Sequence, residues 1–313
     1  IIPKKGIQQK YIIWGTHYGS NDNKFVVPGE NEPIEVPKGV AHFLEHKMFE
    51  QENGKNSLDV LTSIGVNANA YTTNDHTAYL YECTDNFYEA LDEFMDYVQH
   101  PYFTDQNVEK EKGIIGQEIK MYDDYPEWRV YLNALEAMYY KNPVKLDITG
   151  TVETISHIDK DVLYKCYNTF YNPSNMCLVV SGDFEPEKLL EEIKKRLLDT
   201  AQNGEIKRMF EDEPERIVKQ KIEQDMNVSK PIFTIGIKCK VPNQNEKVRI
   251  HIAMEIILNM LIGESSNLYK EMYQTGNIFA MPNLSYEFGD NYAHILITEN
   301  ANNPEILFER LRE

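Results

Sequence analysis

Apolar residues recur at intervals of three and four positions in several segments, and this spacing predicts amphipathic helices. The expected helices span residues 39–50, 57–65, 86–101, 159–171, 186–199 and 246–263. A longer helical region, 104–140, is expected to break near Pro126, because proline lacks the N–H group that a helix interior needs. Residues 304–313 have the pattern of another helix start.

Other segments are rich in β-branched and aromatic residues, which is typical of strands. The expected strands lie within residues 10–20, 66–84, 175–184, 230–241 and 292–300, and the second of these contains two runs around a polar turn. Residues 21–39 contain three prolines and predict a loop. This order of strands, hairpins and helices predicts an α+β fold, with helices on one face of a largely antiparallel sheet.

The stretch from about Thr200 to Glu215 is polar and charged, so we place a domain boundary within it. A chain of 313 residues is long enough for two domains. We therefore expect an N-terminal domain over residues 1–205 and a partial C-terminal domain of similar fold over residues 206–313.

The composition limits the classes of partner. The chain has 50 acidic and 32 basic residues, a formal net charge of −18, which argues against nucleic acid and anionic membrane surfaces. We find no run of 18 apolar residues that would span a membrane, and no signal-peptide pattern opens the chain. The four cysteines form no C-x-x-C pair and lie among apolar or aromatic neighbours, which predicts buried thiols in a reducing compartment, the cytoplasm. They are Cys83, Cys166, Cys177 and Cys239.

The segment GVAHFLEHKMFE, residues 39–50, combines a helical apolar stripe with three polar side chains. His42 and His46 are four residues apart, so both imidazoles can reach one metal ion from the same side of a helix. Glu45 lies beside them and completes H-x-x-E-H, the inverse of the H-E-x-x-H zinc pattern. The alternative is two surface histidines and a solvated glutamate, and the otherwise apolar helix favours the metal site.

A catalytic zinc site needs a third protein ligand. In the helical region after Thr104, the stripe that should face the interior contains Glu111 and Glu118. A buried carboxylate is costly unless it is paired or bound to metal. The charged residues beside Glu111 favour a solvated position for its carboxylate, whereas Glu118 lies among apolar residues and is the better candidate for the ligand. Gly113 and Gly116 would let another backbone approach this helix closely.

Several segments, in the right order, resemble the pitrilysin/insulinase metallopeptidases, the inverzincins. They are GVAHFLEHKMFE, NANAYTTNDHTAYLYE, VEKEKGIIGQEIKMYDDYP, GTVETI and YNPSNMCLVVSGDF. The chain most resembles the single-repeat subunits similar to mitochondrial processing peptidase, and its glutamate segment is most similar to the bacterial YmfH-like branch. The resemblance implies two similar domains, of which we expect the second to be incomplete in this chain.

The resemblance also implies roles for individual residues. It assigns the binding of one zinc ion per chain to His42, His46 and Glu118. It makes Glu45 the general base that activates a water molecule. Glu111 matches a glutamate that supports catalysis from outside the ligand set. Asn69 and Ala70 match a strand edge that pairs with an extended substrate peptide.

Together these features predict a zinc-dependent endopeptidase that hydrolyses extended peptides or unfolded protein segments. One alternative, suggested by the resemblance alone, is a partner or scaffold subunit of a complex that modifies elongation factor P, with little peptidase activity of its own. Another is a zinc hydrolase that acts on a non-peptide substrate. The resemblance further implies a homodimer, or a heterodimer with an inactive homologous subunit. His17 and His76 are expected to be structural or exposed rather than ligands.

Overall fold

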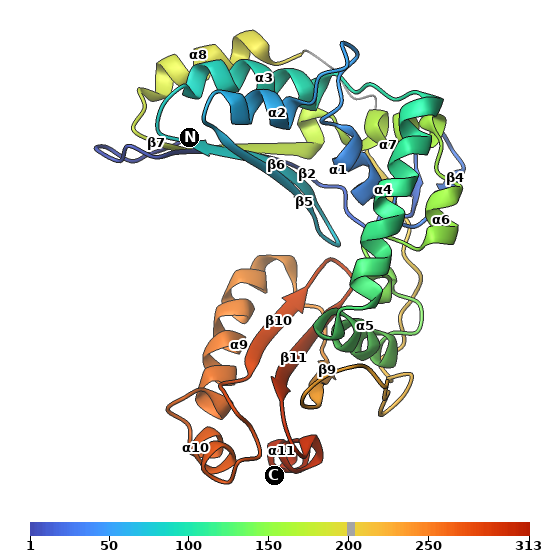
Figure 1. Cartoon of the computed structure of the whole chain (residues 1–313), viewed down its shortest axis with the longest axis vertical. Helices are drawn as coiled ribbons and strands as arrows, with labels where there is room; N and C mark the ends of the chain where they lie inside the picture. The colour runs from blue at the N-terminus through green and yellow to red at the C-terminus, as the bar shows by residue number, and fades with distance from the viewer. Residues whose placement is uncertain (199–203) are drawn as a thin grey trace. The chain divides into compact units, whose positions relative to one another are not determined.

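The computed structural model describes residues 1–198 and 204–313, and its contacts divide the chain into two compact units (Figure 1). Unit 1 comprises Ile1–Ile119 and Asp147–Met209. Unit 2 comprises Lys120–Leu146 and Phe210–Glu313.

These units are not separated by a single cut in the chain. Residues 120–146 lie before the predicted boundary and cluster with unit 2. The predicted boundary region includes residues 199–203, which lie outside the described part of the chain. The predicted domain limits, 1–205 and 206–313, therefore stay a prediction.

A five-stranded sheet with the order β1-β7-β2-β6-β5 forms the base of unit 1 (Figure 1). Its strands are β1 (Ile2–Pro3), β2 (Lys10–Thr16), β5 (Asn67–Thr72), β6 (Thr77–Cys83) and β7 (Met176–Gly182). Neighbouring strands are antiparallel except β1 and β7, which are parallel. One face of the sheet is covered by α2 (Ser57–Ser63), α3 (Phe87–Gln99) and α8 (Pro186–Arg196).

The alternation of side chains explains this one-sided packing. Successive residues of a strand point to opposite faces, and Ile12 and Trp14 of β2 are both buried. Tyr81 and Tyr79 lie opposite them on β6, and all four belong to one core with Phe94 of α3. The predicted α+β fold with a largely antiparallel sheet is confirmed.

The prediction of a loop over residues 21–39 is wrong. β3 (Lys24–Val26) pairs with β4 (Pro33–Glu35) and with β8 (Lys207–Arg208) in a small antiparallel sheet. The prolines obscured these strands, because they lie at a strand end and in the turn. The remaining helices of the first 170 residues are α1 (Val40–Lys47), α4 (Asp105–Asp123), α5 (Pro126–Met138), α6 (Val152–Ser156) and α7 (Lys160–Phe170).

Unit 2 repeats part of the architecture of unit 1. Its sheet has the order β10-β11-β9. This order corresponds to β5-β6-β2 in unit 1, because in each unit the strand of these three that comes first in the sequence pairs with the second strand of the later hairpin. Its strands and helices after residue 210 are β9 (Ile232–Lys238), α9 (Lys247–Ile262), α10 (Asn267–Gln274), β10 (Asn283–Phe288), β11 (Ala293–Asn300) and α11 (Pro304–Arg312). In both units a strand is followed by two helices, a hairpin and a further helix, as expected for two similar domains.

The core of unit 2 is divided between the two faces of its sheet. Leu296 of β11 packs in a cluster with Leu135 of α5. Its neighbours Ile295 and Ile297 pack with Leu258 of α9 on the other side. The outer side of α9 carries apolar residues that no described residue covers, and they are 51–73% exposed: Val248, Ile252, Ile256, Ile257 and Met260.

The cysteines are only partly as predicted. Cys83 and Cys166 are buried, but Cys177 is exposed and Cys239 is half-buried. Cys177 belongs to β7, and its alternate position turns the thiol away from the helices. None of the helices in the described ranges is both long and apolar enough to cross a membrane.

Candidate metal centre

Helix α1 begins at a constrained glycine. Gly39 is its N-cap, with φ at 93°, a backbone conformation that favours glycine. A Cβ atom on Gly39 would lie 2.5 Å from the carbonyl oxygen of Thr149, so the close approach of these two loops also requires glycine. This crossing fixes the first turn of α1, three residues before His42.

The structure brings together the two histidines of α1 and Glu118 of α4. Nε2 of His42 lies 3.6 Å from Oε1 of Glu118, and Nε2 of His46 lies 3.5 Å from Oε2 of the same carboxylate. All three side chains offer ligand atoms within 4.8 Å of one another.

This cluster fits one zinc ion. Ligand atoms about 2.1 Å from a tetrahedral centre lie roughly 3.4 Å from one another. The two contacts with Glu118, one to each oxygen of its carboxylate, are close to this distance, and one ligand atom from each of the three residues lies within 4.8 Å of the others. Two imidazoles and one carboxylate form a donor set that zinc accepts in catalytic sites, where a fourth position stays free. Helix geometry accounts for the pair on α1, since residues four apart share a face.

The charge state of the histidines also suits a cation. Burial and the neighbouring His46 lower the pKa of His42 to about 3, so His42 is neutral at neutral pH and one of its ring nitrogens carries a lone pair that a cation can use. Burial alone would lower the pKa of His46, but the hydrogen bond and charge of Glu111, with the charge of Glu118, raise it. Burial raises the pKa of Glu118. A divalent cation would balance these carboxylates better than a proton does.

Glu45 lies next to the cluster and is held by a strand. Its Oε2 accepts a 2.5 Å hydrogen bond from the hydroxyl of Thr72, the last residue of β5. Burial, with a contribution from the charge of Glu118, raises the pKa of Glu45, although Thr72 and His46 oppose the shift. The sequence analysis did not identify Thr72. The one sequence feature that could have indicated it is its position as the polar residue at the end of the NANAYT strand.

Glu111 is buried and contacts a ligand from behind. Its Oε1 lies 3.1 Å from Nδ1 of His46, so the ring can donate from Nδ1 and present Nε2 to Glu118. The predicted interior stripe of α4 accounts for this position, since Val108 and Ile115 on the same face are also buried.

Asn69 and Ala70 lie on β5, which is the edge strand of the sheet in unit 1. The backbone N–H of Ala70 donates to the side-chain Oδ1 of Asn69 at 2.9 Å. This N–H is therefore not used by β6 and points away from the sheet, where a further strand could pair.

The other sequence-based candidates lie elsewhere. His76 bonds to Asp75 with a 2.6 Å contact, and His17 is exposed; neither belongs to the metal cluster. The expectation that Gly113 and Gly116 allow another backbone to approach α4 is wrong. A Cβ atom at either glycine would meet no described atom within 4 Å.

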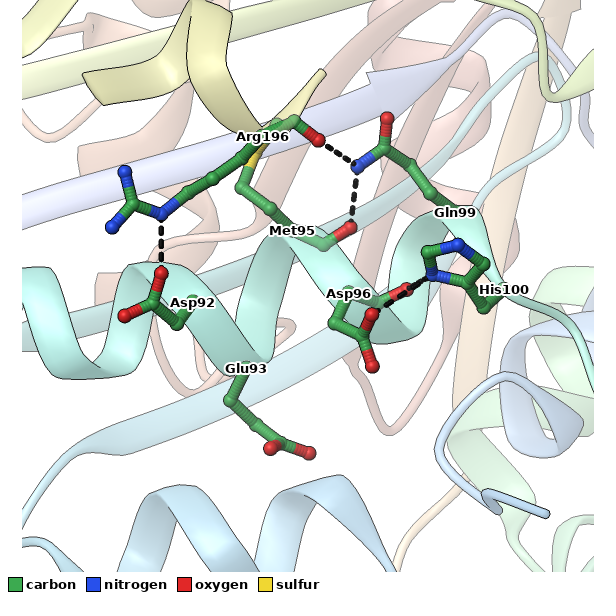
Figure 2. Close-up of a pocket in the computed structure, with 7 residues that line it drawn as sticks. All are labelled: Asp92, Glu93, Met95, Asp96, Gln99, His100 and Arg196. Carbon is green, nitrogen blue, oxygen red and sulfur yellow. Dashed lines mark hydrogen bonds and ion pairs between the residues drawn. The ribbon is translucent and has the colours of Figure 1, made fainter. Parts of the chain in front are cut away.

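Figure 2 shows a pocket on α3 and at the end of α8 that shares no residue with the metal cluster. Two pairs of its side chains contact each other, Arg196 with Asp92 and His100 with Asp96 at 2.9 Å. Glu93 accepts a hydrogen bond from the hydroxyl of Ser57 at 2.6 Å. The pocket therefore offers ion pairs rather than a convergent set of ligands.

Two family models match the chain. The one for insulinase (peptidase family M16) matches residues 31–152, and the one for the peptidase M16 inactive domain matches residues 157–312. YmfH of Bacillus subtilis, described as an uncharacterized zinc protease, is 43% identical over 312 residues, covering 97% of this chain and 72% of YmfH. The chain belongs to peptidase family M16.

Other relatives extend this result. The crystal structure of an M16-like peptidase from Alicyclobacillus acidocaldarius is 35% identical in sequence, with a TM-score of 0.94. The match covers 99% of this chain and 73% of the chain of that peptidase. The beta subunit of the mitochondrial-processing peptidase of Caenorhabditis elegans is 28% identical over 177 residues, which cover 55% of this chain and 38% of that subunit. The resemblance drawn from the sequence and the predicted fold class are both confirmed.

Proposed function

We propose that the chain is a zinc-dependent endopeptidase that hydrolyses extended peptides or unfolded segments of proteins. The proposal rests on one observation above all: a histidine–histidine–glutamate cluster lies beside a carboxylate that the end of an open edge strand holds in place. The relatives described as zinc proteases support the same activity.

Each side chain then has a chemical task. His42, His46 and Glu118 hold the zinc ion, which when bound lowers the pKa of a water molecule and polarises the scissile carbonyl. Glu45 takes the proton of the attacking water and passes it to the leaving amine nitrogen. The raised pKa of Glu45 makes its carboxylate a stronger base. Thr72 occupies Oε2 and leaves Oε1 for this transfer.

Glu111 keeps the ligand His46 in the required tautomer. Its carboxylate accepts from Nδ1, so that Nε2 has no proton and faces the cluster. We propose that Glu111 supports catalysis in this way without touching the substrate.

The edge of β5 provides a binding mode for the peptide. An extended substrate can add to the sheet beside Asn69 and Ala70 by main-chain hydrogen bonds, which favours peptides over small esters or amides. Because Thr72 of the same strand holds Glu45, a peptide paired with β5 is led to the general base.

The proposed partner and compartment rest on one relative and on the cysteines. We propose that the protein works as a homodimer or with an inactive homologous subunit, since one relative is named as a subunit. We propose a cytoplasmic location on the basis of the cysteines, none of which forms a disulfide among the described residues.

The test is cleavage of a mixed peptide library by the zinc-loaded protein and by its Glu45→Gln variant. We expect cleavage by the first, a loss of roughly 10²–10⁴-fold in the second, and one zinc ion in both. Equal cleavage by both would remove Glu45 from the mechanism. Zinc binding without cleavage by either would instead favour the partner or scaffold subunit.

A further inference from the structure

We propose that Lys47 is a positioning residue for the zinc ligand His46, and that it acts through Glu111. The inference rests on the proposed zinc site and adds a residue that the H-x-x-E-H pattern does not contain. It is carried by the burial of Lys47 and by two contacts of the Glu111 carboxylate.

Lys47 occupies a core position of α1. Val40, Phe43 and Leu44 are buried on one face of the helix, and Lys47 is the next residue in the same three- and four-residue spacing. Its side chain is fully buried, with 0% exposure. A charged side chain at such a position is costly unless it is paired, so an apolar residue would be the ordinary choice.

The ammonium group of Lys47 lies between two carboxylates. It forms a close ion pair with Glu50 and lies 3.7 Å from Oε2 of Glu111. The other oxygen of Glu111, Oε1, lies 3.1 Å from Nδ1 of His46. The two oxygens of one carboxylate are thus divided between the lysine and the ligand.

This division fixes the carboxylate of Glu111 in two ways. The positive charge compensates a carboxylate that is only 11% exposed, and it attracts Oε2 across 3.7 Å, which favours the orientation in which Oε1 faces His46. Without the ammonium group, Glu111 would be free to rotate toward water, and Nδ1 of His46 would lose its fixed acceptor. Lys47 therefore orients a zinc ligand that it does not touch.

A purely structural role makes a different prediction. If Lys47 and Glu50 only stabilise the end of α1, their replacement changes the stability of the fold and leaves the zinc site alone. If Lys47 orients Glu111, zinc affinity falls in the folded variant as well, and it stays low when Glu50→Gln is added to remove the carboxylate charge that Lys47→Met leaves unpaired.

The experiment compares Lys47→Met with the wild type in the full chain. Zinc affinity is measured by competition with a chelating dye, and the thermal unfolding of the zinc-free protein is followed in parallel. We expect Lys47→Met to bind zinc about 10–100-fold more weakly, the usual cost of losing a partner behind a ligand. The ¹⁵N signals of His46 should show mixed ring tautomers in the variant and one tautomer in the wild type.

A double-mutant cycle tests the route through Glu111. Glu111→Gln alone should weaken zinc binding, and adding Lys47→Met should weaken it no further. Additive losses would overturn this route. If Lys47→Met does not fold, Lys47→Met/Glu50→Gln replaces it, because that variant leaves no uncompensated Glu50 charge and still deprives Glu111 of its cation.

The matched control is Arg208→Met, which breaks the ion pair with Asp22 (2.9 Å) in the same unit. It should lower stability and leave zinc affinity unchanged. A Lys47→Met variant that binds zinc within threefold of the wild type would overturn the role of Lys47 alone. A wild-type chain that binds no zinc would overturn the proposed function and this inference together.

Discussion

Helix α1 of unit 1 and helix α9 of unit 2 occupy the same place in two similar successions of elements. Helix α1 comes after β2, with β3 and β4 between them, and α9 comes after β9; each helix precedes a second helix and a hairpin. The helix α9 even contains a histidine and a glutamate four residues apart, His251 and Glu255. These two pair with each other at 3.3 Å and are 40% and 59% exposed.

The difference between the helices lies in burial and in a third side chain. In unit 1 the side chains of the two histidines are mostly buried, and Glu118 of α4 lies opposite them. In unit 2 the corresponding pair is solvated, where an ion pair contributes little. The fold provides a place for a metal centre in both units, but only convergence with a carboxylate from another helix makes one.

The largest expected effect is on metal binding. Glu118→Gln should weaken zinc binding by more than about 100-fold, because it removes a charged ligand rather than a partner behind one. Glu255→Gln, the matched change on α9, should leave zinc binding unchanged. Chelator competition on both variants checks the comparison, and a loss in Glu255→Gln would show that unit 2 contributes to the site.

The next effect concerns the glycine before α1. Gly39→Ala should lower the free energy of unfolding by about 3 kcal/mol, since it adds backbone strain and a clash with Thr149. Gly276 in unit 2 also has a positive φ, at 70°, but a Cβ atom there meets nothing within 4 Å. Gly276→Ala should cost only about 1–2 kcal/mol. If urea unfolding gave the same loss of unfolding free energy for both variants, the close approach of Gly39 to Thr149 would not be what makes Gly39 necessary.

A pH-dependent effect is expected in unit 2. Burial opposes ionisation of Glu213, but the hydrogen bond from Lys238 and those from the backbone N–H groups of residues 140–142 lower its pKa to about 2. The folded-state pKa is below the unfolded value of about 4.3, so the stabilisation is present above that pH and is lost as the pH falls toward 2.

Glu213→Gln should therefore lower the free energy of unfolding by about 2 kcal/mol at pH 7 and have almost no effect below pH 2. Unfolding by denaturant at several pH values checks this. A cost that is the same at both ends of the range would show that the charge of Glu213 is not what stabilises the segment.

The smallest effect is expected on the outer side of α9. Ile252→Gln and Met260→Gln should change the free energy of unfolding by no more than about 0.5 kcal/mol, because both side chains are already exposed. Leu258→Ala on the buried side should cost about 2–5 kcal/mol. Thermal unfolding of the three variants checks the contrast. A large loss at Met260 would mean that this side is covered in the folded protein.

The spacing of residues in the sequence predicted those members of the candidate site whose positions depend only on helix geometry. The pair on α1 and the place of Glu118 on α4 both follow from residues three and four apart. The interior stripe also contained Glu111, but charged neighbours hid its burial, because only tertiary contacts with His46 and Lys47 make that position favourable.

The remaining features depend on contacts between distant segments. Pairing of β3 with β8 joins Val26 to Lys207, far apart in the sequence, and short strands with prolines carry little periodic signal. Thr72 was missed because its role depends on where β5 ends relative to α1. Lys47 carried a signal that could have been used, a lysine at the spacing of Val40, Phe43 and Leu44.

The hydrogen bond between Asn69 and Ala70 has a consequence for the behaviour of the protein in a crowded solution. The open edge strand that we propose as the peptide-binding site can also accept a strand from another molecule, which is how sheets begin to aggregate. The side chain of Asn69 already satisfies the N–H of Ala70, so any incoming strand must first displace it. At about 1 kcal/mol for one such bond, affinity for every peptide falls roughly fivefold. The edge of β5 is thus less prone to pair with strands of other molecules, and the proposed binding of substrate peptides is weakened only modestly.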